Sequence, residues 1–366
     1  MSYLDGVERM LAQIAAQDRL RQVEPVRRAG AIDFSSNDYL GLARDPSVVQ
    51  ALHRATRVGS GGSRLLGGRD REHQLLEEEL AAWLGRERAL LFSSGYLAAL
   101  GAIGVLSSLV SSVYSDRLNH ACLIDGIRLG RSRCEIYPHA ALPSREQRRS
   151  GALVVSESIF SMDGDTVAPA GLLDRLGEDD VLLIDEAHAL GVVGSQGAGL
   201  ACRLDDPRVV VLGTLSKSLG GCGGFVAGPA RLIELFINTA RSFIFDTALP
   251  PSLALAARIA LLMARRGDDR RAGLHAAVAR LRTGLRALGH SAIEDLSPIV
   301  PVLLGEERRA LYVAAQLAQF GLIVPAIRPP TVPAGTSRLR ISVRADHTRE
   351  EIDLLIARLG QCIATS

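Results

Sequence analysis

Two polar side chains follow an apolar run in the segment DVLLIDEAH, where Asp185 ends the run and His188 comes three residues later. A carboxylate buried at the end of a strand stabilises a positive charge on a neighbouring ring nitrogen, and a histidine beside it can contact the same ring. The simpler interpretation is a strand that ends in a polar turn, and this segment alone favours it. Asp185 and His188 are therefore candidate site residues whose chemistry depends on what lies near them.

A lysine follows a second apolar run, in VVVLGTLSKSLGGCGG, where Lys217 precedes a glycine-rich segment. Most lysines lie on the surface, but these flanks differ from those of a solvated loop. In such surroundings the pKa of an amine falls, which favours a Schiff base with a carbonyl group. The motif T-x-S-K alone is weak, but Lys217 follows His188 by 29 residues. Acid and amine together predict a pyridoxal 5′-phosphate (PLP) enzyme, because the protonated pyridine ring of PLP is a strong electron sink.

Five short apolar runs are predicted to be buried strands of one mostly parallel sheet in an α/β fold. Their Val, Leu and Ile content suits a sheet covered by helices on both faces. The runs are ALLFSS, ALVVSES, DVLLIDE, RVVVLGTLSK and GGFVAG. Polar residues stand at their ends, among them Ser93, Ser94, Glu157, Asp185 and Lys217. Since ligands bind beyond the carboxyl ends of such strands, these ends are expected to form the site.

The chain is expected to divide into three parts. Residues 1–44 form an N-terminal helix and arm, residues 45–250 a large PLP-binding α/β domain, and residues 251–366 a linker helix and a small C-terminal α+β domain. The first helix is indicated by apolar residues three or four apart near the N-terminus. The small domain is indicated by the strand-like runs IVPVLLG and RLRISVR, with helical patterns beside them.

Composition argues against several classes of function. The 42 basic and 40 acidic residues give a net charge of +2, and aromatic residues make up 4%, so nucleic-acid binding is not expected. None of the five cysteines forms a CxxC pair, so we expect no metal site, and reduced thiols favour a cytoplasmic protein. The N-terminus shows no signal-peptide core. Residues 89–114 are apolar enough to resemble a membrane span, but their Ser and Gly content favours a buried helix instead.

Nine segments in order resemble one family over essentially the whole chain, and they are FSSNDYLGL, GSGGSRLLGG, HQLLEEELA, LFSSGY, DRLNHACLIDGIR, SIFSMDGD, DEAHALGVVG, TLSKSLGGCGG and RPPTVPAGTSRLRISV. The family is the α-oxoamine synthases, PLP enzymes that join an amino acid to an acyl thioester with loss of carbon dioxide. The resemblance implies PLP-dependent transferase fold type I, the aspartate-aminotransferase-like fold. It also implies a homodimer with shared active sites.

The resemblance implies a role for each residue that matches a cofactor-binding position. Lys217 would form the Schiff base, and Asp185 would pair with the pyridine nitrogen. His188 and Ser161 would hydrogen-bond the phenolic oxygen, and His120 would stack on the ring and border the substrate. The remaining cofactor contacts would be the backbone amides of Gly95 and Tyr96, the hydroxyl of Thr214 near the phosphate, and Thr247 supplied across the dimer interface. The catalytic set is Lys217, His120, Asp185 and His188.

The substrate positions come from the same resemblance. Asn37 and Arg340 would hold the amino-acid carboxylate, for which a bidentate guanidinium is well suited. Arg21, Arg328 and Thr331 would line the acyl substrate. Taken alone, Arg21 would be a charge on a helix surface and Arg328 a solvent-facing loop charge, so both alternatives stay open at this point.

Within the family, the segment AIRPPTVPAGTSRLRIS most resembles members that act in biotin biosynthesis. They condense L-alanine with a pimeloyl thioester of coenzyme A or acyl-carrier protein, and they release 8-amino-7-oxononanoate, carbon dioxide and the free thiol. A sister activity, such as glycine C-acetyltransferase or 5-aminolevulinate synthase, is the alternative with the same cofactor residues. A second alternative is a PLP-binding module without this chemistry. A nucleotide-binding protein is disfavoured because no Walker-type GK[ST] occurs.

Overall fold

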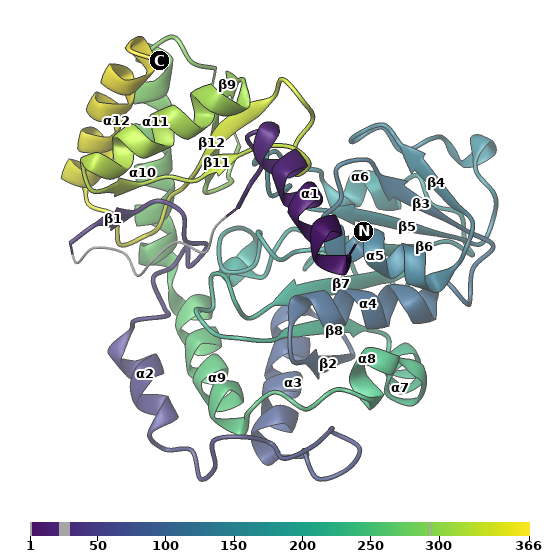
Figure 1. The fold of residues 1–366 in the computed structure, drawn as a ribbon. Coiled ribbons are helices and arrows are strands. Elements are labelled where there is room, and N and C mark those ends of the chain that lie inside the picture. The colour runs from purple at the N-terminus through teal and green to yellow at the C-terminus, as the bar shows by residue number, and fades with distance from the viewer. Residues whose placement is uncertain (1, 22–29, 292, 294) are drawn as a thin grey trace.

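The computed structural model of the chain describes residues 2–21, 30–291, 293 and 295–366. At its centre is a seven-stranded sheet in the order β2-β8-β7-β6-β5-β3-β4 (Figure 1). The strands are β2 (Arg88–Phe92), β3 (Ser112–Asp116), β4 (Cys134–Tyr137), β5 (Ala152–Glu157), β6 (Val181–Asp185), β7 (Val209–Thr214) and β8 (Gly224–Gly228). Only β8 is antiparallel to its neighbours, and the other strands all run in one direction. The predicted mostly parallel sheet is confirmed.

Helices cover both faces of this sheet, which explains the continuous apolar character of its strands. One face packs against α3 (Arg71–Leu84) and α9 (Pro251–Arg266). The other packs against α4 (Gly95–Leu106), α5 (Ala121–Gly130), α7 (Ala230–Thr239) and α8 (Arg241–Ile244). Successive residues of a strand serve opposite faces, so Leu91 belongs to the first core and Leu90 to the second.

A third core lies in the C-terminal part of the chain, around a smaller sheet (Figure 1). Its sheet has the order β11-β12-β9, formed by β11 (Ala326–Ile327), β12 (Ser337–Ser342) and β9 (Ile299–Gly305). The helices α10 (Asp268–Ala287), α11 (Glu307–Gln319) and α12 (Arg349–Ala364) contribute to this core. The short strand β1 (Ile32–Asp33) pairs in parallel with β10 (Leu322–Ile323), which fixes the loop after β1 to the C-terminal part. The three-part division stays a prediction.

The remaining helices are α1 (Tyr3–Ala16), α2 (Pro46–Leu52) and α6 (Pro169–Leu173). The expectation of one buried helix over residues 89–114 is wrong, because this stretch forms β2, α4 and β3. The break falls at Ser94, whose hydroxyl oxygen accepts a hydrogen bond from the amide of Leu97 at 3.2 Å and caps α4. In the part of the chain that the structure describes, no helix is long and apolar enough to cross a membrane.

Candidate active site

Three polar residues predicted to border the site meet at the carboxyl edge of the central sheet. Glu157 ends β5 and Asp185 ends β6, and the two residues are direct partners in the register of these parallel strands. Lys217 follows the end of the next strand, β7, by three residues. Because neighbouring parallel strands end at the same edge, residues separated by 60 positions in the chain are brought together.

The Lys217 amine has two properties of a nucleophile, a lowered pKa and no hydrogen bond from Nζ to the described residues. Burial lowers the pKa of Lys217 to about 8, although the negative charges of Asp185 and Glu157 act in the opposite direction. At this pKa a substantial fraction of the amine is unprotonated near neutral pH. Within the described residues its Nζ atom makes no hydrogen bond, so the amine is not committed to a structural role.

Asp185 and Glu157 form a buried pair of carboxyl groups, exposed by only 6% and 3%. Burial raises the pKa of both groups. For Glu157 the pKa lies well above its usual value, because the Asp185 charge adds to the effect of burial. The Lys217 charge opposes the shift at Asp185. We therefore assign the negative charge of the pair to Asp185 and the proton to Glu157.

The two predicted histidines lie in the same electrostatic cluster. His188 is buried, and burial together with the positive charges of Lys217 and Arg340 lowers its pKa well below the usual value, so its ring is neutral. His120 stands before α5 and its Nδ1 accepts the amide hydrogen of Cys122 at 3.2 Å. Partial removal from water lowers the pKa of His120, with Asp185 opposing the shift. His120, His188, Asp185 and Lys217 thus interact, as predicted from their motifs.

The first turn of α4 offers backbone amides for an anion. No hydrogen bond within the described residues uses the amides of Gly95 and Tyr96, and the helix dipole makes this end positive. Thr214 lies against this turn, since a Cβ placed on Gly95 would stand 3.3 Å from the Thr214 side chain. The Tyr96 side chain points to a different partner, Asp125, to which its hydroxyl donates a hydrogen bond. The geometry is compatible with a phosphate site made of amides and a short hydroxyl.

The predicted carboxylate anchor is assembled from three distant segments. Arg340, on β12, is 5% exposed and its Nη1 donates to Asn37 Oδ1 at 3.0 Å. Its Nε donates to the carbonyl oxygen of Ser161. A guanidinium fixed at two edges by neutral acceptors keeps its charge available for an anion. The structure thus places the predicted anchor residues Arg340 and Asn37 in contact, with the backbone of Ser161, a predicted cofactor residue, beside them.

The three predicted acyl-site residues also lie close to one another. Arg21 is exposed, and its Nη2 donates to the hydroxyl of Thr331 at 3.0 Å. Arg328 donates from Nη1 to the carbonyl oxygen of Asp18, which stands three residues before Arg21. Arg328 is half-buried, and both its predicted acyl-site role and the alternative of a solvent-facing loop charge stay open. Both arginines therefore connect residues 18–21 to the loop that carries Arg328 and Thr331.

Thr247 is the predicted residue that stands apart from these groups. It is exposed and borders a small pocket together with Ser93 and Arg64. Ser93 itself donates a hydrogen bond to Asp246. The predicted role of Thr247, a contact across a dimer interface, stays a prediction.

Known proteins are similar to this chain over most of its length. The family described as aminotransferase class I and II matches residues 29–359. The chain belongs to this family. An 8-amino-7-oxononanoate synthase of Burkholderia mallei (strain SAVP1) is 44% identical over 387 residues, which is 98% of each protein. That of Cellvibrio japonicus (strain Ueda107) is 43% identical over 341 residues, which is 90% of this chain and 85% of the relative.

Similar solved structures support the same placement. A serine palmitoyltransferase of S. paucimobilis, solved with a bound PLP–myriocin adduct, has a TM-score of 0.90 at 28% identity and covers 100% of this chain and 99% of that one. An 8-amino-7-oxononanoate synthase of Francisella tularensis has a TM-score of 0.78 at 27% identity, with 92% and 99% covered. Both the resemblance to the α-oxoamine synthases and the PLP-dependent fold type I are confirmed.

The residues present fit PLP, the cofactor expected from this aminotransferase family. Lys217 supplies an amine that makes no hydrogen bond or ion pair with any residue that the structure describes. Asp185 uses Oδ1 to accept the amide hydrogen of Ala187 at 2.8 Å, while Oδ2 accepts none within the described residues. The first turn of α4 supplies free amides for a phosphate. The cofactor requires three features, which are an amine for its aldehyde, a carboxylate for its ring nitrogen and a binding site for its phosphate.

Sequence reasoning missed two features of the site. Tyr39, in the segment NDYLGL, is fully buried and its hydroxyl lies 2.7 Å from His188 Nδ1. The only signal for it was a large polar aromatic residue within a matched segment. The second feature is that Lys217 is the only lysine among the 42 basic residues of the chain. A count of lysines would have found it.

A charged histidine fixes the loop that carries Ser161. The ring of His139 lies between two carboxylates, with Nδ1 3.0 Å from Asp116 Oδ1 and Nε2 2.5 Å from Asp165 Oδ2. Asp165 stands in the same segment as Ser161, FSMDGD. The hydrogen bonds with Asp116 and Asp165 raise the pKa of His139 to about 10. The ring is therefore an imidazolium at neutral pH and connects the end of β3 to this loop.

We expect this imidazolium to stabilise the fold below its pKa only. A raised folded-state pKa gives stability that is complete below the unfolded value of 6.5 and that disappears as the pH rises through about 10. At about pH 7, His139→Gln should lower the free energy of unfolding by on the order of 3 kcal/mol. Denaturant unfolding at about pH 7 and about pH 10 measures this difference, which should become small at the higher pH. An equal loss at both pH values, or the same loss in the exposed-site control His53→Gln, contradicts the assignment.

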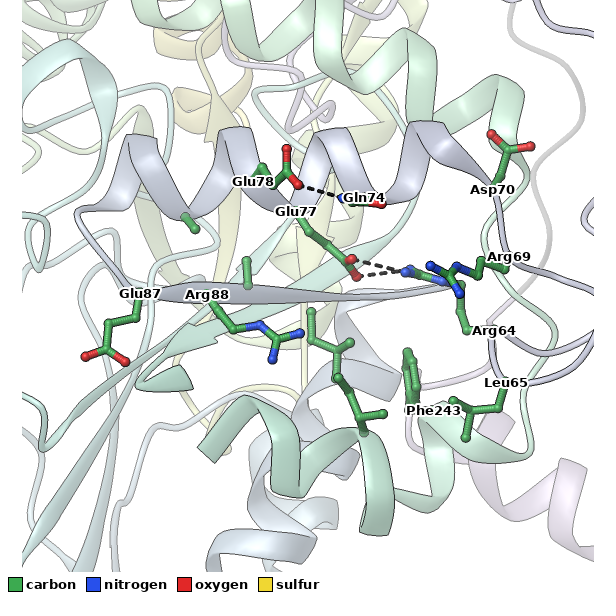
Figure 2. A pocket seen from close by; sticks show the side chains of 14 residues that line it. Arg64, Leu65, Arg69, Asp70, Gln74, Glu77, Glu78, Glu87, Arg88 and Phe243 are labelled. Atoms are coloured by element: carbon green, nitrogen blue, oxygen red, sulfur yellow. Dashed lines mark hydrogen bonds and ion pairs between the residues drawn. The ribbon is translucent and has the colours of Figure 1, made fainter. Parts of the chain in front are cut away.

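A larger pocket lies away from these residues, between α3 and the edge strand β2 (Figure 2). Its volume is about 460 Å³, and none of the predicted site residues lines it. Arg64 and Glu77 make two hydrogen bonds of 3.0 Å across it. Glu77 also accepts the amide hydrogen of Leu91 at 2.9 Å and so covers the free edge of β2. These paired charges serve the sheet edge, and we assign the pocket no catalytic role.

Proposed function

We propose that this chain is a PLP-dependent acyltransferase that condenses L-alanine with a pimeloyl thioester, with loss of carbon dioxide, to give 8-amino-7-oxononanoate and the free thiol in biotin biosynthesis. The observation that carries the proposal is the buried, uncommitted Lys217 amine in electrostatic contact with Asp185 at the carboxyl edge of the sheet. The names of the most similar relatives support the choice of reaction within the family.

When bound, PLP supplies an aldehyde that captures amines and a ring that withdraws electrons from the captured nitrogen. The Lys217 amine holds the cofactor and, once displaced, removes the proton from the Cα atom of the amino acid as a general base. The Asp185 carboxylate keeps a hydrogen on the ring nitrogen. His120 would stack on the ring, and His188 and Ser161 would hydrogen-bond its phenolic oxygen.

The carboxylate of L-alanine binds at Arg340 and Asn37. Arg340 presents a guanidinium that is fixed through Nε and Nη1 and lies beside the Tyr39 hydroxyl, and its positive charge is available for a carboxylate. A fixed donor costs little side-chain entropy when the substrate binds. The two residues therefore orient the Cα–H bond relative to the Lys217 amine, which is the condition for proton removal.

The acyl substrate binds where Arg21, Arg328 and Thr331 meet. Pimeloyl thioesters carry a carboxylate, or its ester, at the end distant from the thioester. Arg21 and Arg328 offer positive charge for the free acid, and the Thr331 hydroxyl offers a hydrogen bond for either form. Both coenzyme A and acyl-carrier protein are acyl donors compatible with this arrangement.

The assembly that we propose is a homodimer in which Thr247 reaches the site of the partner subunit. The exposed position of Thr247 supports a contact outside its own chain. We further propose that the protein works in the cytoplasm, since its five cysteines are free thiols.

An absorbance experiment followed by an activity panel tests this function. Purified protein with PLP should show a visible absorbance band that changes when L-alanine is added, and pimeloyl-CoA should then release free thiol. Glycine and serine with short and long acyl-CoAs are the controls, because sister enzymes of the family prefer them. Faster turnover with glycine and a short acyl-CoA favours the sister activity. A visible band without thiol release from any pair contradicts the catalytic proposal.

A further inference from the structure

Tyr39 is a buried hydroxyl that touches two parts of the site. Its side chain is fully buried in the C-terminal core, and its carbonyl oxygen accepts the amide hydrogen of Ala345 at 2.8 Å. Its hydroxyl oxygen lies 2.7 Å from His188 Nδ1 and 3.1 Å from Asn37 Oδ1. Burial raises the pKa of Tyr39 to about 12, so the hydroxyl keeps its hydrogen at neutral pH. One fixed hydroxyl therefore connects the cofactor side with the carboxylate anchor.

The hydrogens around Tyr39 allow two arrangements. Neutral His188 has one ring hydrogen, and Tyr39 has one hydroxyl hydrogen. In the first arrangement His188 Nδ1–H donates to Tyr39, and Tyr39 donates to Asn37 Oδ1, which satisfies both contacts. In the second arrangement Tyr39 donates to His188 Nδ1, the ring hydrogen lies on Nε2, and the contact with Asn37 Oδ1 has no hydrogen. The first arrangement is therefore preferred in the protein alone.

Each arrangement sets a different state of the anchor. In the first, Asn37 Oδ1 accepts from both Tyr39 and Arg340 Nη1, at 3.1 Å and 3.0 Å. In the second, the single hydroxyl hydrogen of Tyr39 is used on His188, so Tyr39 can only accept from Asn37, and the Asn37 amide is favoured with its NH₂ group toward Tyr39. Arg340 Nη1 then loses its bond to Asn37 and keeps its bond to Ser342 Oγ at 2.9 Å, which leaves one Nη1 hydrogen for a carboxylate. A change at His188 is thereby transmitted to Arg340 over three hydrogen-bonded contacts, His188–Tyr39, Tyr39–Asn37 and Asn37–Arg340.

We propose that Tyr39 is a positioning residue that couples cofactor binding to the release of the amino-acid anchor. The inference rests on the proposed function, in which His188 hydrogen-bonds the phenolic oxygen of the cofactor. His188 Nε2 makes no hydrogen bond with the described residues, so it is the ring nitrogen left for that oxygen. Donation from His188 Nε2 to the cofactor oxygen requires the second arrangement. In that arrangement Tyr39 donates to His188, and Arg340 loses its bond to Asn37.

The position of the His188 ring hydrogen tests the proposal directly. Nitrogen NMR of protein labelled in its eight histidines, with the His188 signal identified by its loss in His188→Gln, reports which nitrogen carries the hydrogen. We expect Nδ1–H in the cofactor-free protein and Nε2–H after PLP is added. In Tyr39→Phe, which keeps the ring, we expect Nε2–H in both states. Wild-type protein that shows Nε2–H without the cofactor, or cofactor-free Tyr39→Phe that still shows Nδ1–H, overturns the proposal.

A binding measurement gives a second readout. In Tyr39→Phe with PLP, the apparent Kd for L-alanine, from the change in visible absorbance, should rise about tenfold, the effect of losing one buried hydrogen bond. The matched control is Tyr114→Phe, since Tyr114 is 2% exposed and its hydroxyl accepts the amide hydrogen of Arg149 at 3.1 Å, outside the site. An unchanged Kd in Tyr39→Phe refutes the coupling while the proposed function stands. Wild-type protein that binds no PLP overturns both.

Discussion

Replacement of Lys217 by alanine should abolish both the covalent attachment of PLP and turnover. The variant loses the amine that holds the cofactor and the base that removes the Cα proton, so kcat/KM should fall by at least about 10³-fold. Borohydride reduction followed by peptide mass spectrometry measures the attachment, and thiol release measures the turnover. In wild-type protein the cofactor mass should be found on the peptide that contains Lys217.

The composition of the chain lowers the background of this experiment. Free PLP also reacts with surface lysines in most proteins, but here Lys217 is the only lysine. In Lys217→Ala the only remaining amine is at the N-terminus, and it lies on a different peptide. Cofactor found on the N-terminal peptide of both proteins is therefore the background. Thiol release at the wild-type rate by Lys217→Ala would end the case for this amine as the reactive group.

The sequence predicted the central sheet and the site at its edge because both depend on local patterns. The apolar runs that end in Glu157, Asp185 and the residues before Lys217 form adjacent parallel strands, and parallel strands place their ends together. The motifs also identified Arg340 and Asn37, which the structure places 3.0 Å apart. The family and fold predictions are confirmed, while the residue roles stay predictions.

The features that were missed depend on contacts between distant segments. Tyr39 meets His188 across 149 residues, and a pattern of spacing contains no information on such a pair. β3 and β4 were missed because each is short and mixes polar with apolar residues, as in SVYSD and CEIY. The same limit explains the error over residues 89–114. A continuous apolar composition does not separate a buried strand from a buried helix, and only the cap at Ser94 marks the change.

Replacement of Asp185 by asparagine should leave the cofactor bound and slow the reaction. Asparagine keeps the size of the side chain and still accepts the amide hydrogen of Ala187 through Oδ1. It has no charge to keep a hydrogen on the ring nitrogen, so the electron sink is weakened. We expect a loss of roughly 3–5 kcal/mol of transition-state stabilisation, which is about 10²–10⁴-fold in kcat/KM.

The matched control is Glu157→Gln, at the register partner of Asp185. Burial and the Asp185 charge raise the pKa of Glu157 well above its usual value, so glutamine replaces a carboxyl group that is already neutral. Its Oε1 can still accept the amide hydrogen of His120, a bond of 2.6 Å in the structure. The loss in kcat/KM should therefore be at least tenfold smaller than in Asp185→Asn. Equal losses in the two variants would mean that the charge is shared by the pair, and a larger loss in Glu157→Gln would place it on Glu157.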